Sequence, residues 1–184
     1  MNLLIKNAPD YITVGGKKLY IRTDFSLWVR FLIACKNRDD DEIADSITAI
    51  VKGEIPRGKE AQAEFAKACF AWLSAGKEQG RQQSQAGQAA FDFEQDGSVI
   101  YCEMWEYFPH LMQRGISFHE GIEIIQTLLH NDSTMLWHRA FARCGDFSAL
   151  SKNEKKYWTK ERAKYTIRMK QSQEQIDAVM SGDF

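Results

Sequence analysis

Four histidines are the side chains best suited to metal binding or acid–base catalysis: His110, His119, His130 and His138. No two of them have the spacing of the zinc-binding motif H-E-x-x-H, and His119-Glu120 lacks the second histidine of that motif. The sequence also lacks G-x-S-x-G, which marks a serine nucleophile, and the glycine-rich motifs that bind nucleotides. We therefore predict a protein with no catalytic residue, no cofactor and no metal site.

Five carboxylates and no lysine or arginine lie between residues 91 and 108, which gives this acidic segment a formal charge of -5. Paired carboxylates can perform acid–base catalysis or bind a cation. Asp92, Glu94 and Asp96 also stand where a helix is expected to begin, and a helix dipole stabilises negative charge there. No glycine-containing calcium loop follows, so we favour helix capping over a metal site.

Residues 152–170 form a basic segment, in which eight Lys and Arg against two Glu give +6. Three interleaved aromatic residues would allow it to bind a nucleic-acid backbone and to stack bases, so a nucleic-acid-binding helical module is our alternative function. We favour a solvated helix face, because the net charge of the whole chain is only -1. A third interpretation is contact between the basic and acidic segments, within one chain or between copies in a homo-oligomer.

The basic segment is expected to lie on one long helix from Lys152 to Met180, about 43 Å in length at 1.5 Å per residue. A narrow apolar stripe along that helix suits docking against another chain or against the body of the domain. Trp158 is the best candidate for an exposed anchor. The candidate partner-binding residues are Trp158, Tyr165, Met169, Ile176, Lys155, Lys156 and Lys160.

The first long element after the N-terminus is a predicted helix from about Phe25 to Lys36, with Asp24 as its N-cap residue. One apolar face holds Trp28, Phe31, Leu32 and Cys35. Other faces carry Phe25, Leu27, Val29 and Ile33, which leaves only Ser26 and Arg30 to meet water. This helix must therefore be covered on nearly every side.

The remaining pattern predicts a mainly α-helical domain with a short N-terminal β-hairpin and a long C-terminal helix. The hairpin joins 11–14 to 18–22 through Gly15-Gly16. Ser117 with Glu120, and Ser151 with Glu154, have the spacing of capping boxes, and Ser133 is placed to cap a further helix. The expected helices cover approximately residues 25–36, 43–51, 60–73, 94–108, 118–129, 134–141 and 152–180.

The domain organisation follows from one glycine- and glutamine-rich stretch. Residues 74–90 contain no large apolar side chain and read as a flexible linker. It separates 1–73, the hairpin with its helices, from 91–184, a helical region expected to pack with 1–73 as one compact unit. With 44% hydrophobic residues, 184 residues and no apolar run near 20 residues, the chain is expected to be a cytosolic protein that contacts no membrane.

Three segments, in this order along the chain, resemble the landmarks of the bacteriophage gene product 15 family. They are 21–25 leading into Trp28, the stretch 91–96 followed by Ile100-Tyr101, and 150–157. The matching residues with an expected structural role are Asp24, Phe25, Trp28, Asp92, Phe93, Glu94 and Asp96. One departure is that Phe118-His119-Glu120-Gly121-Ile122 stands where the family usually carries paired tryptophans and a phenylalanine.

The resemblance implies a non-enzymatic tail assembly chaperone that acts in the cytoplasm of the bacterial host. Family members are encoded beside the gene for the phage tape-measure protein. The resemblance therefore implies the tape-measure protein as the binding partner and the tail-tube protein as a second partner. A tape-measure protein is long and largely helical, and its apolar faces need a cover until the tube encloses them. We expect recognition of the helix-in-groove kind, repeated by many copies along the client.

Overall fold

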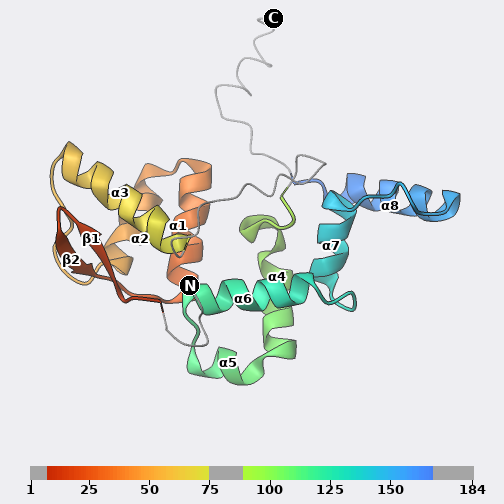
Figure 1. Cartoon of the computed structure of the whole chain (residues 1–184), viewed down its shortest axis with the longest axis horizontal. Helices are drawn as coiled ribbons and strands as arrows, with labels where there is room; N and C mark the ends of the chain where they lie inside the picture. Colours follow the sequence, from red (N-terminus) through yellow and green to blue (C-terminus); the bar gives the residue numbers. More distant parts are fainter. Residues whose placement is uncertain (1–7, 75–88, 168–184) are drawn as a thin grey trace, which may run out of the picture.

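The computed structural model describes residues 8–74 and 89–167. The described chain is mainly helical and opens with a two-stranded antiparallel hairpin, β1 (Tyr11–Val14) and β2 (Lys17–Tyr20), so the predicted fold class is confirmed (Figure 1). The helices are α1 (Phe25–Asn37), α2 (Asp40–Ile50), α3 (Lys59–Leu73), α4 (Phe93–Tyr107), α5 (Pro109–Arg114), α6 (Phe118–Leu129), α7 (Met135–Cys144) and α8 (Lys152–Tyr165). Among the described helices, none is both long and apolar enough to cross a bilayer.

The hairpin turns at Gly15 and Gly16, whose φ angles of 55° and 75° are conformations that glycine adopts without a steric penalty. The pairing register places Ile12 opposite Leu19, and Ile12 is buried. This side of the hairpin packs with α3 against the first of two hydrophobic cores.

The first core lies between the hairpin, α1, α3 and the start of α6. Trp28 and Trp72 stack at its centre with ring centroids 4.4 Å apart. Both indole N–H groups donate to backbone carbonyl oxygens, Trp28 to that of Arg22 and Trp72 to that of Pro9, so neither ring is buried with an unpaired donor. The buried members are Ile12, Ile21, Trp28, Phe31, Ile50, Val51, Phe65, Cys69, Trp72 and Phe118.

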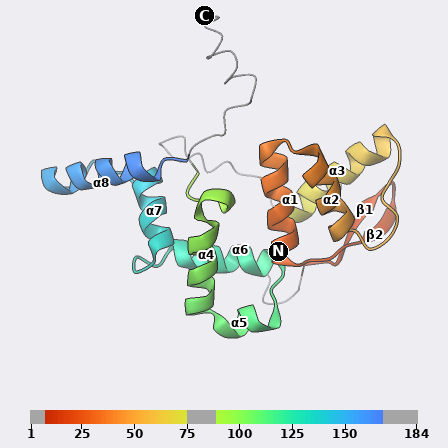
Figure 2. The ribbon, with the colours of Figure 1, turned by 180° about the vertical axis from the view of Figure 1, so that it is seen from behind.

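The second core lies between α4, α6 and α7, and its buried members are Ile100, Met104, Ile124, Ile125, Leu128 and Leu136. Helix α6 contributes side chains to both cores, and Phe25 of α1 packs against both. Figures 1 and 2 show α6 running from α7 across to the N-terminal helices. Helix α1 lies near the start of α6, and α4 crosses it nearer to α7. The two regions predicted on each side of residues 74–90 thus pack together through α6.

Most helix starts agree with the sequence patterns, but α2 begins at Asp40, three residues before the predicted Ile43, and Asp24 precedes α1 without a side-chain capping bond. Both predicted capping boxes form, at Ser117–Glu120 and at Ser151–Glu154. The prediction that Ser133 caps α7 is wrong, because Thr134 is the N-cap residue and its hydroxyl accepts from the backbone N–H of Trp137 at 3.1 Å. Pro109 ends α4 as expected but also begins α5, at a position where its missing N–H costs nothing.

The prediction of one continuous helix to Met180 is wrong at Thr166. This residue has φ -51° and ψ 127°, which are not helical, so α8 ends at Tyr165. Arg143 donates from Nε to the carbonyl oxygen of Tyr165 at 2.6 Å, so a tertiary hydrogen bond is made at the point where the helix stops. Met169 and Ile176 lie outside the described residues, as do positions 75–88 of the predicted linker.

Close contact between α1 and α6 depends on a glycine. A Cβ built on Gly121 would lie 2.1 Å from Cδ2 of Phe25, far inside van der Waals contact. The Phe25 ring is confined there by Phe118, which stacks on it at 6.3 Å, and by Phe93, whose ring meets it edge-on at 6.1 Å. Gly121 is therefore a packing requirement at the junction of the two cores.

We expect Gly121→Ala to lower the free energy of unfolding by about 1–3 kcal/mol, because the methyl group would force Phe25 out of its site. Gly97→Ala is the matched control, since a Cβ there meets nothing within 4 Å and alanine favours a helix over glycine by about 0.5–1 kcal/mol. Urea unfolding followed by circular dichroism measures both. Equal effects of the two substitutions would contradict the packing argument.

Candidate partner-binding groove

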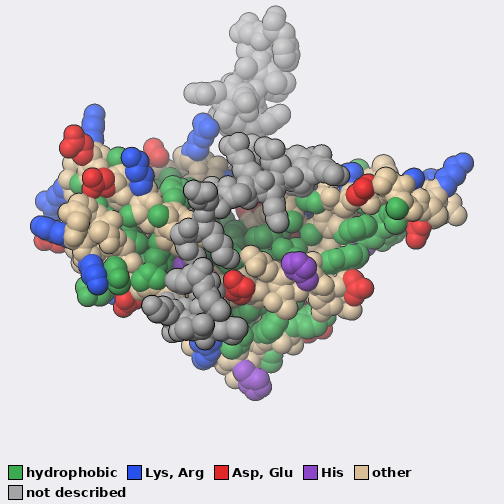
Figure 3. All heavy atoms as spheres, viewed as in Figure 1, with side chains coloured by type: hydrophobic (Ala, Val, Ile, Leu, Met, Phe, Trp, Pro, Cys, Tyr) green, Lys and Arg blue, Asp and Glu red, His purple; other side chains and the backbone are tan. Residues whose placement is uncertain are grey.

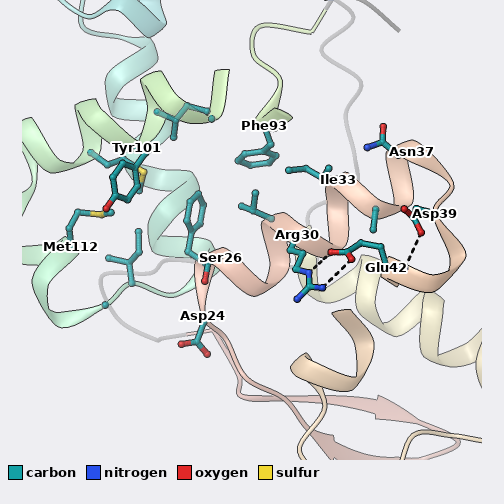
Figure 4. A pocket seen from close by; sticks show the side chains of 18 residues that line it. Asp24, Ser26, Arg30, Ile33, Asn37, Asp39, Glu42, Phe93, Tyr101 and Met112 are labelled. Carbon is teal, nitrogen blue, oxygen red and sulfur yellow. Dashed lines mark hydrogen bonds and ion pairs between the residues drawn. The ribbon is translucent and has the colours of Figure 1, made fainter. Parts of the chain in front are cut away.

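An apolar groove with a volume of about 530 Å³ separates α1 from α4. Figure 4 shows its side chains, with the α1 residues on one wall and Phe93 and Tyr101 of α4 on the other. Met112 of α5 and Ile116 of the following loop also line the groove. None of these residues was singled out from the sequence as a partner-binding residue.

The α1 wall is built from a face of the helix that the cores leave uncovered. Trp28 and Phe31 point into the first core and are buried. Val29 and Ile33, one turn apart, line the groove, and neither is among the residues of the described chain that pack against the two cores. The sequence indicated that this helix needs cover on nearly every side, and the described chain leaves this side open.

The α4 wall combines apolar side chains with a gap. Ile100 and Met104 show one edge to the groove, and Gly97 contributes no side chain at all. Tyr101 lines the groove but is 58% exposed, and it meets the exposed Trp105 edge-on with centroids 6.4 Å apart. These two rings extend the apolar surface of the groove along α4 towards solvent.

An ion pair between Lys36, near the end of α1, and Asp92, just before α4, links the two walls of the groove. Lys36 of α1 donates from Nζ to Asp92 at 2.6 Å and lies 3.6 Å from a carboxylate oxygen of Glu94. Asp92 is at the same time the N-cap residue of α4, and it accepts from the backbone N–H groups of Glu94 and Gln95. The capping role that we predicted for the start of the acidic segment therefore applies to Asp92.

Asp96 shares the predicted capping role, because its Oδ2 accepts from the backbone N–H of Asp92 at 2.9 Å, and it also anchors α4 to α7. Its carboxylate is fully buried and accepts from Arg143 at 2.5 and 3.0 Å and from Arg139 at 2.9 Å. Burial by itself would raise the pKa of Asp96, but the hydrogen bonds from Arg143 and Arg139 outweigh it and hold the pKa below its ordinary value. The carboxylate therefore stays ionised, and it holds α4 against α7.

Glu103, also in the acidic segment, holds the start of α7. Its buried carboxylate accepts from the backbone N–H groups of Met135 and Leu136. Negative charge at a helix N-terminus is favourable, because the first N–H groups have no partner within the helix. Asp92, Asp96 and Glu103 are thus all engaged by contacts within the fold.

The basic helix α8 lies against α7, far from the groove. Trp158 is half-buried, with its ring centroid 4.7 Å from that of Phe141 and 4.8 Å from that of His138. Tyr165 is half-buried beside Arg139, whose guanidinium carbon lies 5.3 Å from its ring centroid. The prediction of Trp158 as an exposed anchor is therefore wrong, because Trp158 and Tyr165 pack against α7 of the same chain.

The lysines of α8 lie at the surface, where Lys155 donates from Nζ to the carbonyl oxygen of Ser148 at 2.9 Å and Lys164 lies 3.7 Å from Glu161. Lys155, Lys156 and Lys160 are exposed, and among the described residues no ion pair includes any of them. Figure 3 shows Lys and Arg side chains at the outer tip of this helix, at the far right of the view. No ion pair joins α8 to the acidic segment in the described chain, so the contact we considered between these two segments is not made there.

Three of the four histidines, His119, His130 and His138, make local polar contacts. His119 is buried with Nε2 2.9 Å from the carbonyl oxygen of Trp72, and His138 lies 3.2 Å from a carboxylate oxygen of Glu161. Within residues 8–74 and 89–167, no three His, Cys, Asp or Glu side chains are grouped as a metal site would require.

Comparison with protein-family models, with curated proteins and with solved structures gives no match to this chain.

We expect Asp96→Asn to cost about 3–5 kcal/mol of unfolding free energy at pH 7, because it leaves Arg143, only 2% exposed, without its carboxylate. Glu94→Gln is the control, since its partly exposed pair with Lys36 is worth at most about 1 kcal/mol. The pH dependence is a second readout. The stability supplied by Asp96 is present above its unfolded pKa of about 4 and is lost as pH falls through the lower folded pKa, so the Asn variant must lose less stability in acid.

Proposed function

We propose that this protein is a phage tail morphogenesis factor, a tail assembly chaperone that covers apolar helical surface of the tape-measure protein by reversible, non-covalent binding in the host cytoplasm. The observation that carries the proposal is the groove between α1 and α4, in which Val29 and Ile33 lie outside both cores of the described chain. The resemblance of residues 21–25, 91–96 and 150–157 to the gene product 15 family supports the same conclusion.

The dimensions of the groove suit a helix as the client. Helix α1 has 13 residues, which at 1.5 Å per residue gives a wall of about 20 Å, or between three and four turns of a bound helix. An apolar stripe at i, i+3, i+4 and i+7 would contact both walls at once.

Reversibility follows from the small size of the contact. Burying one aliphatic side chain supplies about 1.5–3 kcal/mol, and the loss of rotational and translational freedom on binding offsets much of the total. One groove therefore binds weakly, and many copies along one long client bind it firmly. Polymerisation of tail-tube subunits around the client can then displace the copies one by one, which makes the tube protein and further copies of this chain secondary partners in the proposal.

The role of the groove is tested by replacing Val29 and Ile33, the aliphatic side chains that line it and belong to neither core. We expect the double variant V29S/I33S to leave a co-expressed tape-measure protein insoluble, whereas the native chain keeps it in the soluble fraction. Loss of about 1.5 kcal/mol at each position lowers the affinity by about a hundredfold in total. Both side chains are half-buried but belong to neither core, so the circular dichroism of V29S/I33S should stay native and its urea midpoint should fall only slightly.

V29I/I33V is the matched control, because it exchanges the two aliphatic groups and keeps the groove apolar. It should retain the solubilising effect. Should the tape-measure protein be equally insoluble with and without the native chain, the chaperone proposal would be wrong; should V29S/I33S work as well as native protein, the groove would not be the binding surface.

A second candidate function rests on the exposed lysines of α8. A nucleic-acid-binding module would use Lys155, Lys156 and Lys160 on phosphates and Tyr157, which is 50% exposed, for stacking. Nothing in the groove between α1 and α4 would contribute to such binding.

The two functions are separated by a mobility-shift titration with single- and double-stranded DNA at several salt concentrations. If α8 binds nucleic acid, K155Q/K156Q/K160Q should reduce the slope of log affinity against log salt by about two to three, since about three phosphate contacts are lost. K17Q/K52Q/K59Q removes the same charge from exposed positions outside α8 and should leave the slope unchanged. Absence of binding by the native chain at low salt would eliminate this candidate.

A further inference from the structure

The charged side chains that line the groove are mostly acidic. They are Asp24, Arg30, Asp39 and Glu42. Arg30 is engaged by Glu42 through both carboxylate oxygens, with Nη2 donating to Oε2 at 3.0 Å, so this pair is neutral as a whole. The other two carboxylates of the groove, those of Asp24 and Asp39, make no ion pair with any described residue.

These two carboxylates stand at opposite ends of the groove. Asp24 precedes α1 and Asp39 follows it, so about 20 Å of helix separates them. Figure 4 shows the arrangement, with Asp24 at one end, Asp39 at the other and the Arg30–Glu42 pair between them. Asp24 is exposed and makes no capping hydrogen bond to α1, while Asp39, also exposed, caps α2 by accepting from the backbone N–H of Glu42 at 3.0 Å.

The surroundings of both ends are acidic as well. Beyond Asp39, the first turn of α2 adds the exposed carboxylates of Asp40 and Asp41. Beyond Asp24 lies a polar hollow that also contains Asp10, and the arginine in that hollow, Arg114, is paired with Glu120 at 2.6 Å. The groove therefore has an apolar middle and an excess of carboxylates at each end, which Arg38 next to Asp39 offsets in part.

We propose that the groove selects an amphipathic helix whose apolar stripe is bracketed by a lysine or arginine at each end, about 12 to 13 positions apart. The spacing is the distance from Asp24 to Asp39 divided by 1.5 Å per helical residue. This inference rests on the proposed function, in which the groove holds a client helix, and it adds the charge pattern that a client segment must carry. A helix with acidic residues at the same two positions meets like charges at both ends and is disfavoured.

The test uses the full-length protein and three synthetic fluorescein-labelled peptides of about 20 residues, whose affinities are measured by fluorescence anisotropy. The first has a leucine stripe bracketed by two lysines, and the second has glutamates in place of those lysines. The third has the composition of the first, with its leucines distributed around the helix. Two exposed ion pairs predict that the lysine-bracketed peptide binds about threefold to tenfold more tightly than the glutamate-bracketed one at low salt, and that the difference shrinks at 0.5 M salt.

The double variant D24N/D39N should abolish that preference. D132N/E123Q is its matched control, since it removes the same two charges from exposed positions on α6 and the following turn, outside the groove, and should preserve the preference. Equal binding of the lysine- and glutamate-bracketed peptides, both tighter than the distributed peptide, would overturn the charge-pattern inference and leave the groove as a helix site. If the striped peptides bind no better than the distributed peptide, the groove does not take a helix, and both the inference and the proposed mechanism are wrong.

Discussion

The buried carboxylate of Asp96 is the constraint on which the arrangement of the second half depends. A charge that is fully removed from water is tolerable only when its partners are fixed, and here two arginines from successive turns of α7 surround it. Arg143 also bonds the last carbonyl group of α8 and that of Ala90, so one cluster ties the start of α4, the body of α7 and the end of α8 together. The position of the α4 wall, and hence the width of the groove, follows from this cluster.

Different faces of α1 contact different parts of the structure, and this connects the geometry to the proposed function. Successive side chains of one short helix serve the first core through Trp28, the junction of the cores through Phe25, and the groove through Val29. A helix with this many apolar side chains would promote aggregation if its exposed face were broad and flat. The groove limits the exposed apolar surface to a slot between two walls, with the carboxylates of Asp24 and Asp39 near its ends.

Features governed by neighbours in the sequence were predictable, and features governed by distant contacts were not. The hairpin, the two capping boxes and the apolar character of α1 each follow from a few adjacent residues. The pairing of Asp96 with Arg143 joins residues 47 positions apart, so only the helix-capping half of the chemistry of the acidic segment could be read locally. The apolar periodicity likewise predicts a helix through Thr166, where the structure ends it. The groove could be anticipated only as an excess of apolar faces on α1, because its second wall comes from a helix about 70 residues away.

The packing of both halves on α6 has a consequence for how such a chain can change over generations. Phe25 and Phe118 meet across the junction, and the ring of His119 holds the last turn of α3 through the carbonyl oxygen of Trp72, so the halves are joined by contacts that do not involve residues 75–88. For a connection between elements that are already held together by packing, doubling the number of residues costs only about 0.6 kcal/mol of closure entropy. Insertions and deletions can therefore accumulate between α3 and α4 while the architecture around them is inherited intact.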